Sequence, residues 1–267
     1  MNGTRFFTLT RGGHNTLWSI GRVQTPLLAM IVKRDEEITN FVQSDFWEVH
    51  TIYKNALFKH LSGKFKEEKK AENILSKIIN HNLTIKEIKN KKEKISPPLL
   101  YDLTDLQKDM NKKYSLTAND TLKTAQTLYE KKHITYPRTD SRFLTLDMKE
   151  SIPQLLEKLK PGRENLTAKL NLNKLKFSKR NFNDGKVTDH HAIIPTEIVP
   201  QNLTQNEQKL YDAIVTRLAS IFHPPCIKAV STVIANIQGE TFKAKGTSIL
   251  DPGWQSLYPG KDKNKHK

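Results

Sequence analysis

Residues 103–141 read LTDLQKDMNKKYSLTANDTLKTAQTLYEKKHITYPRTDS. In the first part of this stretch, apolar residues recur at the spacing of one helix face, namely Leu103, Leu106 and Met110. Thr104 with Gln107 three residues later has the pattern of a capping box, which places the start of the helix here. The stretch is therefore predicted to open with a short amphipathic helix.

A second helix is predicted after the basic turn at residues 112–115. Thr117 can cap its first turn together with Asp120, and its core-facing side is predicted to consist of Ala118, Leu122, Ala125 and Tyr129. A β-branched and aromatic run follows at residues 134–136. Two short helices joined by a tight turn and followed by such a run indicate a helix-turn-helix or winged-helix unit.

Other helices and strands are predicted before this helical centre. Apolar and polar residues alternate over residues 47–53, as a half-buried strand requires. A charged helix is predicted at residues 71–79, followed by a strand at residues 83–88. A helix with Pro26 in its first turn is predicted ahead of them, over residues 21–37.

Strands return after the helical centre. Thr204 with Glu207 predicts a capped helix, and small or apolar residues then alternate over residues 227–237. Residues 238–239 are suited to a hairpin turn that leads into a strand over residues 241–249. This order of elements predicts an α+β fold, in which a strand-rich domain is interrupted by an inserted helical domain.

The charge of the chain narrows the class of partner. Its 267 residues include 44 Lys and Arg against 28 Asp and Glu, a formal charge of +16 that indicates a polyanionic partner, nucleic acid first. An anionic membrane surface is the competing partner, but no apolar run is long enough to cross a bilayer and no signal-peptide core follows Met1. A soluble, intracellular protein is predicted. The lysine-rich residues 64–94 are interpreted as a solvated face.

Three isolated residues are assigned mainly to packing. The single cysteine, Cys226, excludes an internal disulfide and a cysteine cluster for zinc, and it is predicted to be a buried small apolar residue. Trp18 and Tyr101 have the chemistry of base-stacking platforms, but each is more typical of a core aromatic residue.

The segment from Ile134 to Ser141 brings a phenol, a guanidinium, hydroxyls and a carboxylate together. A phenol with the ordinary pKa of ~10 is only about 0.1% ionised at neutral pH, so a nucleophilic tyrosine needs positive charge nearby. Arg138 can supply that charge, and its planar fork matches a phosphate group. On an extended stretch Tyr136 and Arg138 project to the same face, and Pro137 between them disfavours helix. The alternative is a packed aromatic residue beside a surface charge.

Two further segments carry polar candidates. His190 and His191 are adjacent, so on a strand they point to opposite faces and do not easily serve one site together. A zinc site is not expected without further close ligands. Near the N-terminus, a glycine-permitted turn places Ser19, Arg22 and Gln24 at the mouth of a helix, where backbone N–H groups favour an anion. A plain helix cap is the alternative there.

Four segments, taken together, resemble the type IA DNA topoisomerases, and the topoisomerase III branch most closely. They occur in the order and at the spacing of that family, and the similarity covers nearly the whole chain. The segments are SIGRVQTP at residues 19–26, the helical residues 103–107, 121–122 and 125–130, ITYPRTDS at residues 134–141, and DHHAIIPT at residues 189–196.

The resemblance implies roles for individual residues. In that family the tyrosine of the YxRTDS segment attacks a phosphodiester of single-stranded DNA and forms a 5′-phosphotyrosine bond, and another strand passes through before religation. Tyr136 is therefore implied to be the nucleophile and Arg138 the phosphate-stabilising cation. His190 is implied to contact the phosphate or the active site, where it can also relay a proton. The implied DNA contacts are Ser19, Arg22, Gln24, Thr139, Asp140, Ser141 and His191.

The resemblance also implies a domain organisation within the toroidal type IA fold. The expected parts are the single-strand-binding domain IV (residues 1–44), the strand-rich arch domain II (residues 45–97 and 223–253), the winged-helix, CAP-like tyrosine domain III (residues 98–222) and a tail (residues 254–267). Type IA enzymes begin with an acidic Toprim domain that holds Mg²⁺, and nothing before SIGRVQTP matches it. The family's later gate segment has no match either. The chain is therefore expected to be a fragment of the enzyme, with no metal bound by its own residues.

The implied function is the relaxation or decatenation of DNA by the parent enzyme, in the cytoplasm at the bacterial nucleoid. Its substrates are expected to be single-stranded DNA and supercoiled or catenated duplex DNA, with no membrane partner and a monomeric state. The chain alone is expected to bind DNA without turning over. The alternative that the residues leave open is a non-enzymatic winged-helix DNA-binding protein.

Overall fold

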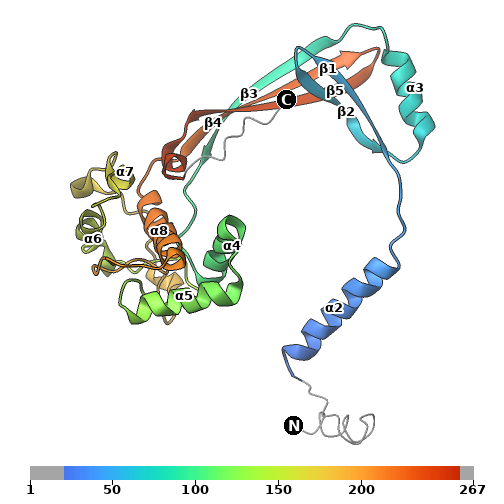
Figure 1. The fold of residues 1–267 in the computed structure, drawn as a ribbon. Coiled ribbons are helices and arrows are strands. Elements are labelled where there is room, and N and C mark those ends of the chain that lie inside the picture. Colours follow the sequence, from blue (N-terminus) through green and yellow to red (C-terminus); the bar gives the residue numbers. More distant parts are fainter. Residues whose placement is uncertain (1–20, 259–267) are drawn as a thin grey trace, which may run out of the picture. The chain divides into compact units, whose positions relative to one another are not determined.

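The computed structural model describes residues 21–258 (Figure 1). The chain divides into two compact units. The first contains Ile237–Phe242 and the described part of Met1–Leu83, and the second contains Thr84–Asn236 and the described part of Lys243–Lys267. None of the helices in residues 21–258 combines the length and apolar character needed to cross a bilayer.

Helices and one antiparallel sheet make up the chain, so the predicted α+β class is confirmed. The helices described are α2 (Gln24–Thr39), α3 (Glu68–Ile78), α4 (Leu103–Tyr114), α5 (Ala118–Glu130), α6 (Ile152–Lys158), α7 (Glu164–Thr167) and α8 (Gln205–Ser220). Short 3₁₀ helices are η1 (Asp147–Lys149), η2 (Leu172–Lys174), η3 (Asp184–Lys186) and η4 (Gly253–Leu257). The strands are β1 (Trp47–Tyr53), β2 (Ala56–Phe65), β3 (Thr84–Ile95), β4 (Cys226–Ile237) and β5 (Glu240–Asp251), in the sheet order β1-β2-β5-β4-β3.

In the first unit, β1 and β2 form an antiparallel hairpin against which α3 packs. Its two-residue turn consists of Lys54 and Asn55, whose φ values of 46° and 64° are those of a type I′ turn. Helix α3 buries Ala71 and Ile78. Helix α2 begins near the predicted position and buries none of its residues.

A buried histidine ties this unit together. His60 on β2 is 7% exposed, and its Nε2 lies 3.1 Å from Oε2 of Glu240. Lys77 of α3 donates to the other oxygen of Glu240 at 2.6 Å. These hydrogen bonds from Lys77 and His60 lower the pKa of Glu240, so the carboxylate stays ionised between its two partners.

The strand β3 of the second unit is long and rich in lysine. β3 pairs with β4 in antiparallel register from Thr84↔Asn236 to Ile95↔Cys226, so the predicted strand at residues 83–88 extends well beyond its expected end. β3 lies at the edge of the sheet, where exposed lysines are tolerated and discourage pairing with other chains.

Helices α4, α5 and α8 form the centre of the second unit (Figure 1). The predicted capping box at the start of α8 is confirmed, because the Thr204 side chain accepts from the Glu207 N–H and the Glu207 side chain accepts from the Thr204 N–H. Most of α8 is buried, including Leu210, Ile214 and Leu218 of the predicted face.

Two predictions for the helical centre were wrong in detail. α4 begins at Leu103, and its N-cap is Asp102, which accepts from the Asp105 N–H at 2.6 Å; the Thr104 hydroxyl is therefore already inside the helix. The predicted cap of α5 by Thr117 is confirmed, but the buried stripe of α5 is Thr121, Ala125 and Leu128. Tyr129 is 38% exposed, so the predicted face was rotated.

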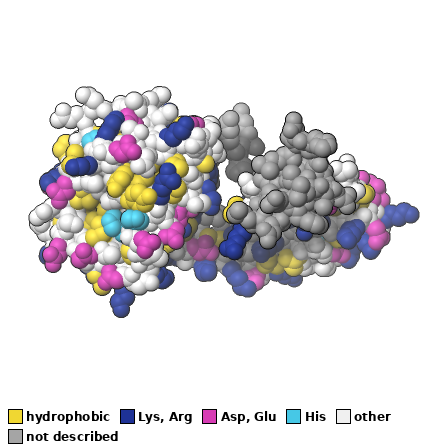
Figure 2. Space-filling view, turned by 90° about the horizontal axis from the view of Figure 1, so that it is seen from below, with side chains coloured by type: hydrophobic (Ala, Val, Ile, Leu, Met, Phe, Trp, Pro, Cys, Tyr) yellow, Lys and Arg dark blue, Asp and Glu magenta, His cyan; other side chains and the backbone are white. Residues whose placement is uncertain are grey.

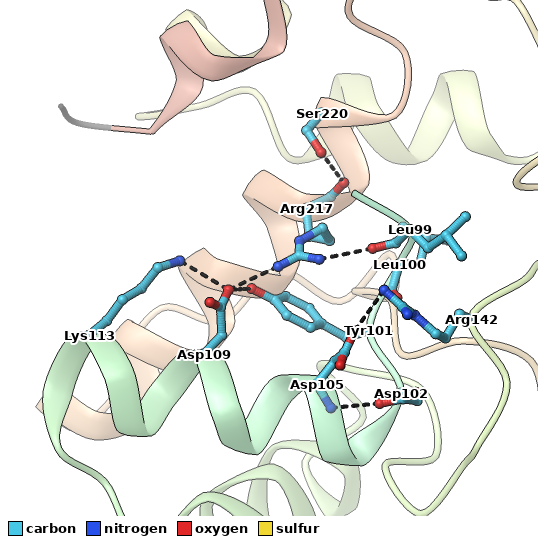
Figure 3. Close-up of polar contacts among 10 residues, drawn as sticks. All are labelled: Leu99, Leu100, Tyr101, Asp102, Asp105, Asp109, Lys113, Arg142, Arg217 and Ser220. Atoms are coloured by element: carbon cyan, nitrogen blue, oxygen red, sulfur yellow. Dashed lines mark hydrogen bonds and ion pairs between the residues drawn. The ribbon is translucent and has the colours of Figure 1, made fainter. Parts of the chain in front are cut away.

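A buried ionic cluster joins α4, α8 and the segment between β3 and α4 (Figure 3). The Arg217 side chain on α8 is 9% exposed, and its guanidinium lies 3.8 Å from the ring centroid of the fully buried Tyr101. Arg217 also donates to Asp109 of α4 at 2.9 Å. The core assignment of Tyr101 is thereby confirmed.

The protonation states of the cluster follow from its surroundings. Burial raises the pKa of Tyr101, so its hydroxyl stays protonated and donates to Asp109. Burial alone would raise the pKa of Asp109, but the hydroxyl of Tyr101, Lys113 and Arg217 together hold that pKa below its ordinary value. The cluster therefore consists of a neutral phenol and a carboxylate between two cations.

Three arginines bind consecutive parts of the segment that enters α4. Their donors reach backbone carbonyl oxygens: Arg180 to Pro97 at 2.7 Å, Arg217 to Leu99 at 2.9 Å and Arg142 to Leu100 at 3.4 Å. Arg142 also pairs with Asp105 at 2.6 Å. These bonds satisfy carbonyls of a segment that belongs to no helix or strand.

Near the end of the second unit, Gly253 packs closely against the backbone of Pro224 and Pro225. Gly253 has φ of 50°, and a Cβ there would lie 2.5 Å from the Pro224 carbonyl oxygen, so only glycine fits. The next residue, Trp254, donates through its indole to the Ile95 carbonyl at 2.9 Å. Cys226 is fully buried, as predicted. Residues 254–258, assigned to the tail from the sequence, belong to this ordered turn.

We expect Arg217→Met to lower the free energy of unfolding by about 3 kcal/mol, because it removes a buried cation that binds Asp109 and the Leu99 carbonyl and lies over the ring of Tyr101. Urea unfolding followed by circular dichroism measures this. The matched control is Arg163→Met, which removes an ion pair to the 45%-exposed Asp212 and should cost less than about 1 kcal/mol. Equal losses in the two variants would contradict a special role for Arg217.

A second prediction concerns pH. The hydrogen bond from Lys131, with that from the Thr204 N–H, lowers the pKa of Glu207 from 4.5 to about 2. Because the folded-state pKa lies below the unfolded-state value, this stabilisation is complete above pH 4.5 and is lost as the pH falls toward 2. Glu207→Gln should lower the free energy of unfolding by about 1 kcal/mol at neutral pH. The difference in the free energy of unfolding between the variant and the unsubstituted protein should shrink as the pH falls from 4.5 toward 2. A difference that stays constant over this range would refute the lowered pKa of Glu207.

Candidate active site

The segment with the predicted nucleophile begins at a tight reversal after α5. The Lys132 N–H donates to the Tyr129 carbonyl and the His133 N–H donates to the Leu128 carbonyl, both at 2.8 Å. Lys132 has φ of 61°, so the helix ends in a Schellman motif with lysine in the position usually taken by glycine. The reversal directs Tyr136 back toward the last turn of α5.

The DHHAIIPT segment holds the tyrosine segment from its other side. The Thr135 N–H donates to the Ile194 carbonyl at 2.9 Å, and the Ile194 N–H donates to the Thr135 hydroxyl at 3.0 Å. Ile134 and Pro195 form an isolated antiparallel bridge. Two of the motifs found in the sequence, far apart along the chain, thus lie side by side.

Tyr136 is half-buried, and its ring contacts two other aromatic rings. Its ring centroid lies 4.4 Å from that of His190 at an interplanar angle of 45°, and 5.3 Å from that of Tyr129 at 76°. A cavity of about 260 Å³ opens beside it. The residues that line this cavity are Tyr136, Thr145, Val187, Thr188, Asp189, His190 and His191.

The polar residues after Tyr136 divide into two groups. Thr139 and Ser141 are 6% and 5% exposed, and their hydroxyls are used inside the protein. Thr139 donates to the His190 carbonyl and accepts from the Ser141 N–H, both at 3.0 Å, and the Ser141 hydroxyl donates to the Lys186 carbonyl at 3.2 Å. These two residues shape the loop and hold the backbone of His190 next to it.

Arg138 and Asp140 belong to the exposed group. Asp140 accepts from the Thr188 hydroxyl at 3.1 Å. Within residues 21–258, no hydrogen bond or ion pair engages the Arg138 guanidinium. His190 is exposed and His191 is half-buried, with its Nδ1 lying 2.8 Å from the Ala192 carbonyl oxygen. Arg138 and His190 are thus accessible to a ligand.

The predicted N-terminal contacts lie in the other unit. Ser19 and Trp18 fall outside the described residues. Arg22 and Gln24 are exposed, in the turn before α2 and at its first residue. The Gly21 N–H donates to the Thr25 hydroxyl at 3.3 Å, which closes that turn.

The surface around the site is mixed in character. Figure 2 shows histidine side chains on the open face of the helical part, with hydrophobic and acidic side chains beside them and lysines and arginines scattered around. In the part of the chain that the structure describes, no three His, Cys, Asp or Glu side chains come together as a metal site.

Comparison with known proteins identifies the family. Residues 1–267 match the profile of a family described as DNA topoisomerase. The chain belongs to this family. Its similarity to DNA topoisomerase 3 of Bacillus anthracis is 38% identity over 267 residues, covering 97% of this chain and 36% of the relative. DNA topoisomerase 3 of Bacillus subtilis (strain 168) is 37% identical over 268 residues, with the same coverage.

A solved structure supports the fold of this DNA topoisomerase family member. Full-length topoisomerase I from Thermotoga maritima matches with a TM-score of 0.68 and 21% identity, covering 96% of this chain and 42% of that one. The resemblance to the type IA topoisomerases, and to topoisomerase III among them, is confirmed. The chain spans about 36% of the length of the curated relatives it matches.

Sequence reasoning missed several residues that the structure places at the site. Four of them line the cavity, namely Thr145, Val187, Thr188 and Asp189, and the fifth is Tyr129. Tyr129 was assigned to the buried face of its helix, yet its ring contacts Tyr136. The available signal was its position one residue from the end of α5, seven residues before Tyr136. The helix end and the chain reversal were needed to bring the two rings together.

Proposed function

We propose that this chain provides the strand-cutting tyrosine of a type IA DNA topoisomerase, an enzyme that changes DNA topology. One observation carries the proposal: in a member of the DNA topoisomerase family, Tyr136 lies half-buried beside a cavity with its ring against His190. The alternative, that Tyr136 is only a packed core aromatic residue, fits poorly with its position in the lining of a solvent-accessible cavity.

The proposed reaction is a reversible transfer of a phosphodiester. The phenol oxygen of Tyr136 attacks the phosphorus atom of a single-stranded segment and loses its proton. The bond from phosphorus to the 3′ oxygen breaks, and that oxygen takes up a proton. The product is a 5′-phosphotyrosine link and a free 3′ hydroxyl. After another strand has passed, the 3′ hydroxyl attacks the same phosphorus atom and releases Tyr136.

Arg138 and His190 are the residues we assign to phosphate chemistry. The accessible guanidinium of Arg138 can bind two phosphate oxygens and compensate the charge that develops on them. His190 touches the ring of Tyr136, so it is placed to contact the phosphate and to relay the phenolic proton. The adjoining Thr139, Asp140, Ser141 and His191 are proposed to shape or line the DNA path.

The rest of the site is proposed to lie in other parts of the enzyme. Ser19, Arg22 and Gln24 are assigned to the single strand, within the domain boundaries predicted from the sequence. Mg²⁺ is assigned to an acidic Toprim domain, which residues 21–258 do not resemble. The chain alone is proposed to bind DNA as a monomer without turning over. Relaxation of supercoiled plasmid by this chain with Mg²⁺ would overturn that last point.

A non-enzymatic DNA-binding protein is the second candidate, because the charge of +16 and the capped helices α4 and α5 suit DNA contact without chemistry. Covalent capture of DNA separates the two candidates, since only the enzyme forms a bond to the strand.

Replacing Tyr136 by Phe removes the attacking oxygen and keeps the ring. In the full-length gene product, covalent capture of a 3′-labelled single-stranded oligonucleotide should be lost entirely, while affinity for the same oligonucleotide stays within about twofold. Tyr114→Phe, at the end of α4, is the matched control and should capture DNA normally. Undiminished capture by the Tyr136 variant would point to another nucleophile, whereas a complete lack of covalent capture by the unsubstituted protein would support the second candidate.

DNA affinity should depend strongly on salt. If about six phosphates of a single strand are contacted, raising the salt from ~50 to ~200 mM should weaken binding roughly 300-fold, because each contact releases counterions. Fluorescence anisotropy across that range measures the slope. A flat response would count against both candidate functions.

A further inference from the structure

Tyr129 has a placement that a simple packing role does not explain. It lies one residue from the end of α5 and is 38% exposed, whereas its neighbour Leu128 is fully buried. The buried stripe of Thr121, Ala125 and Leu128 anchors the helix without it. Its ring therefore occupies the surface at the site, on a helix whose position the core has already determined.

The ring of Tyr129 meets the ring of Tyr136 edge to face, with centroids 5.3 Å apart and an angle of 76°. This is a favoured geometry for two aromatic rings, because the positive edge of one meets the negative face of the other. Tyr136 also contacts the ring of His190. The ring of Tyr136 is thus contacted by a tyrosine from α5 and by a histidine from the DHHAIIPT segment.

The backbone next to Tyr136 is already restrained by the two hydrogen bonds between Thr135 and Ile194. The freedom that remains to the phenol is rotation about its side-chain bonds, among a few staggered positions. The two neighbouring rings remove some of those positions. Holding a nucleophile near its attack geometry lowers the barrier of the chemical step without changing how well substrate binds.

We propose that Tyr129 is a positioning residue for the strand-cutting tyrosine. Its ring holds the phenol of Tyr136 in the orientation from which it attacks the phosphodiester. The inference rests on the proposed function, since it assigns Tyr129 a part in that reaction. The ring performs the task, so Phe serves in place of Tyr129 and an aliphatic residue does not.

The first test compares Tyr129→Leu with Tyr129→Phe in the full-length gene product. Single-turnover capture of a saturating single-stranded oligonucleotide should slow about five- to tenfold in the Leu variant, the size expected for one lost aromatic pair, and stay within about twofold in the Phe variant. The dissociation constant for the oligonucleotide should stay within about twofold in both. Tyr114→Leu is the matched control, since Tyr114 also ends its helix and is 41% exposed.

The second test needs no catalysis and uses this chain as it is. With 3-fluorotyrosine placed at position 136, fluorine NMR reports the ring currents of its two neighbours. The resonance should be shifted from that of the free amino acid, should move back toward it in Tyr129→Leu and should stay in place in Tyr129→Phe. Thermal unfolding of each variant shows whether the fold is retained.

The outcomes separate the two ideas. If Tyr136→Phe still captures DNA, the proposed function fails whatever Tyr129 does. If Tyr136→Phe abolishes capture but Tyr129→Leu captures at the unsubstituted rate, only the positioning role fails. A slow Leu variant that Phe does not rescue, or a fluorine resonance unmoved by Tyr129→Leu, also overturns the positioning role.

Discussion

The helical unit depends on the contact of Arg217 with Asp109 and Tyr101. One guanidinium, almost fully buried on α8, binds the carboxylate of α4, lies over a buried ring and donates to the carbonyl of Leu99. A charge taken from water is tolerated only when such partners replace the water. The contact therefore ties together α4, α8 and the segment that enters α4, beside the apolar core of this unit.

The geometry of the candidate active site extends from this cluster through backbone hydrogen bonds. The Tyr101 carbonyl accepts from the Ile193 N–H at 2.9 Å, which places the DHHAIIPT segment. That segment binds Thr135 in turn, next to Tyr136. On the other side Arg142, which directly follows the ITYPRTDS segment, reaches the Leu100 carbonyl and Asp105. The tyrosine segment is thus held at both ends by groups that contact the same stretch of chain.

The residues of the ITYPRTDS segment have different tasks, although the motif presents them as one run. Thr139 and Ser141 face inward and determine the path of the loop, while Arg138 and Asp140 face solvent. An internal hydroxyl cannot bind a phosphate and keep its internal bonds at the same time, so the loop-shaping residues and the candidate phosphate-binding residues are distinct.

Local patterns in the sequence determined the types of the elements they predicted, but not β2, α6 or α7, for which no element was predicted. They also determined the hairpin at residues 238–239, the caps at Thr117 and Thr204, the burial of Cys226, and the family through its spaced motifs. These features depend on neighbours along the chain, which is why they were predictable. The sequence did not determine the N-cap of α4, the rotation of α5 or the extent of β3. Tertiary structure alone decided that Tyr129 and His190 both contact the ring of Tyr136, because that arrangement needs a helix end, a chain reversal and a distant segment to meet in space.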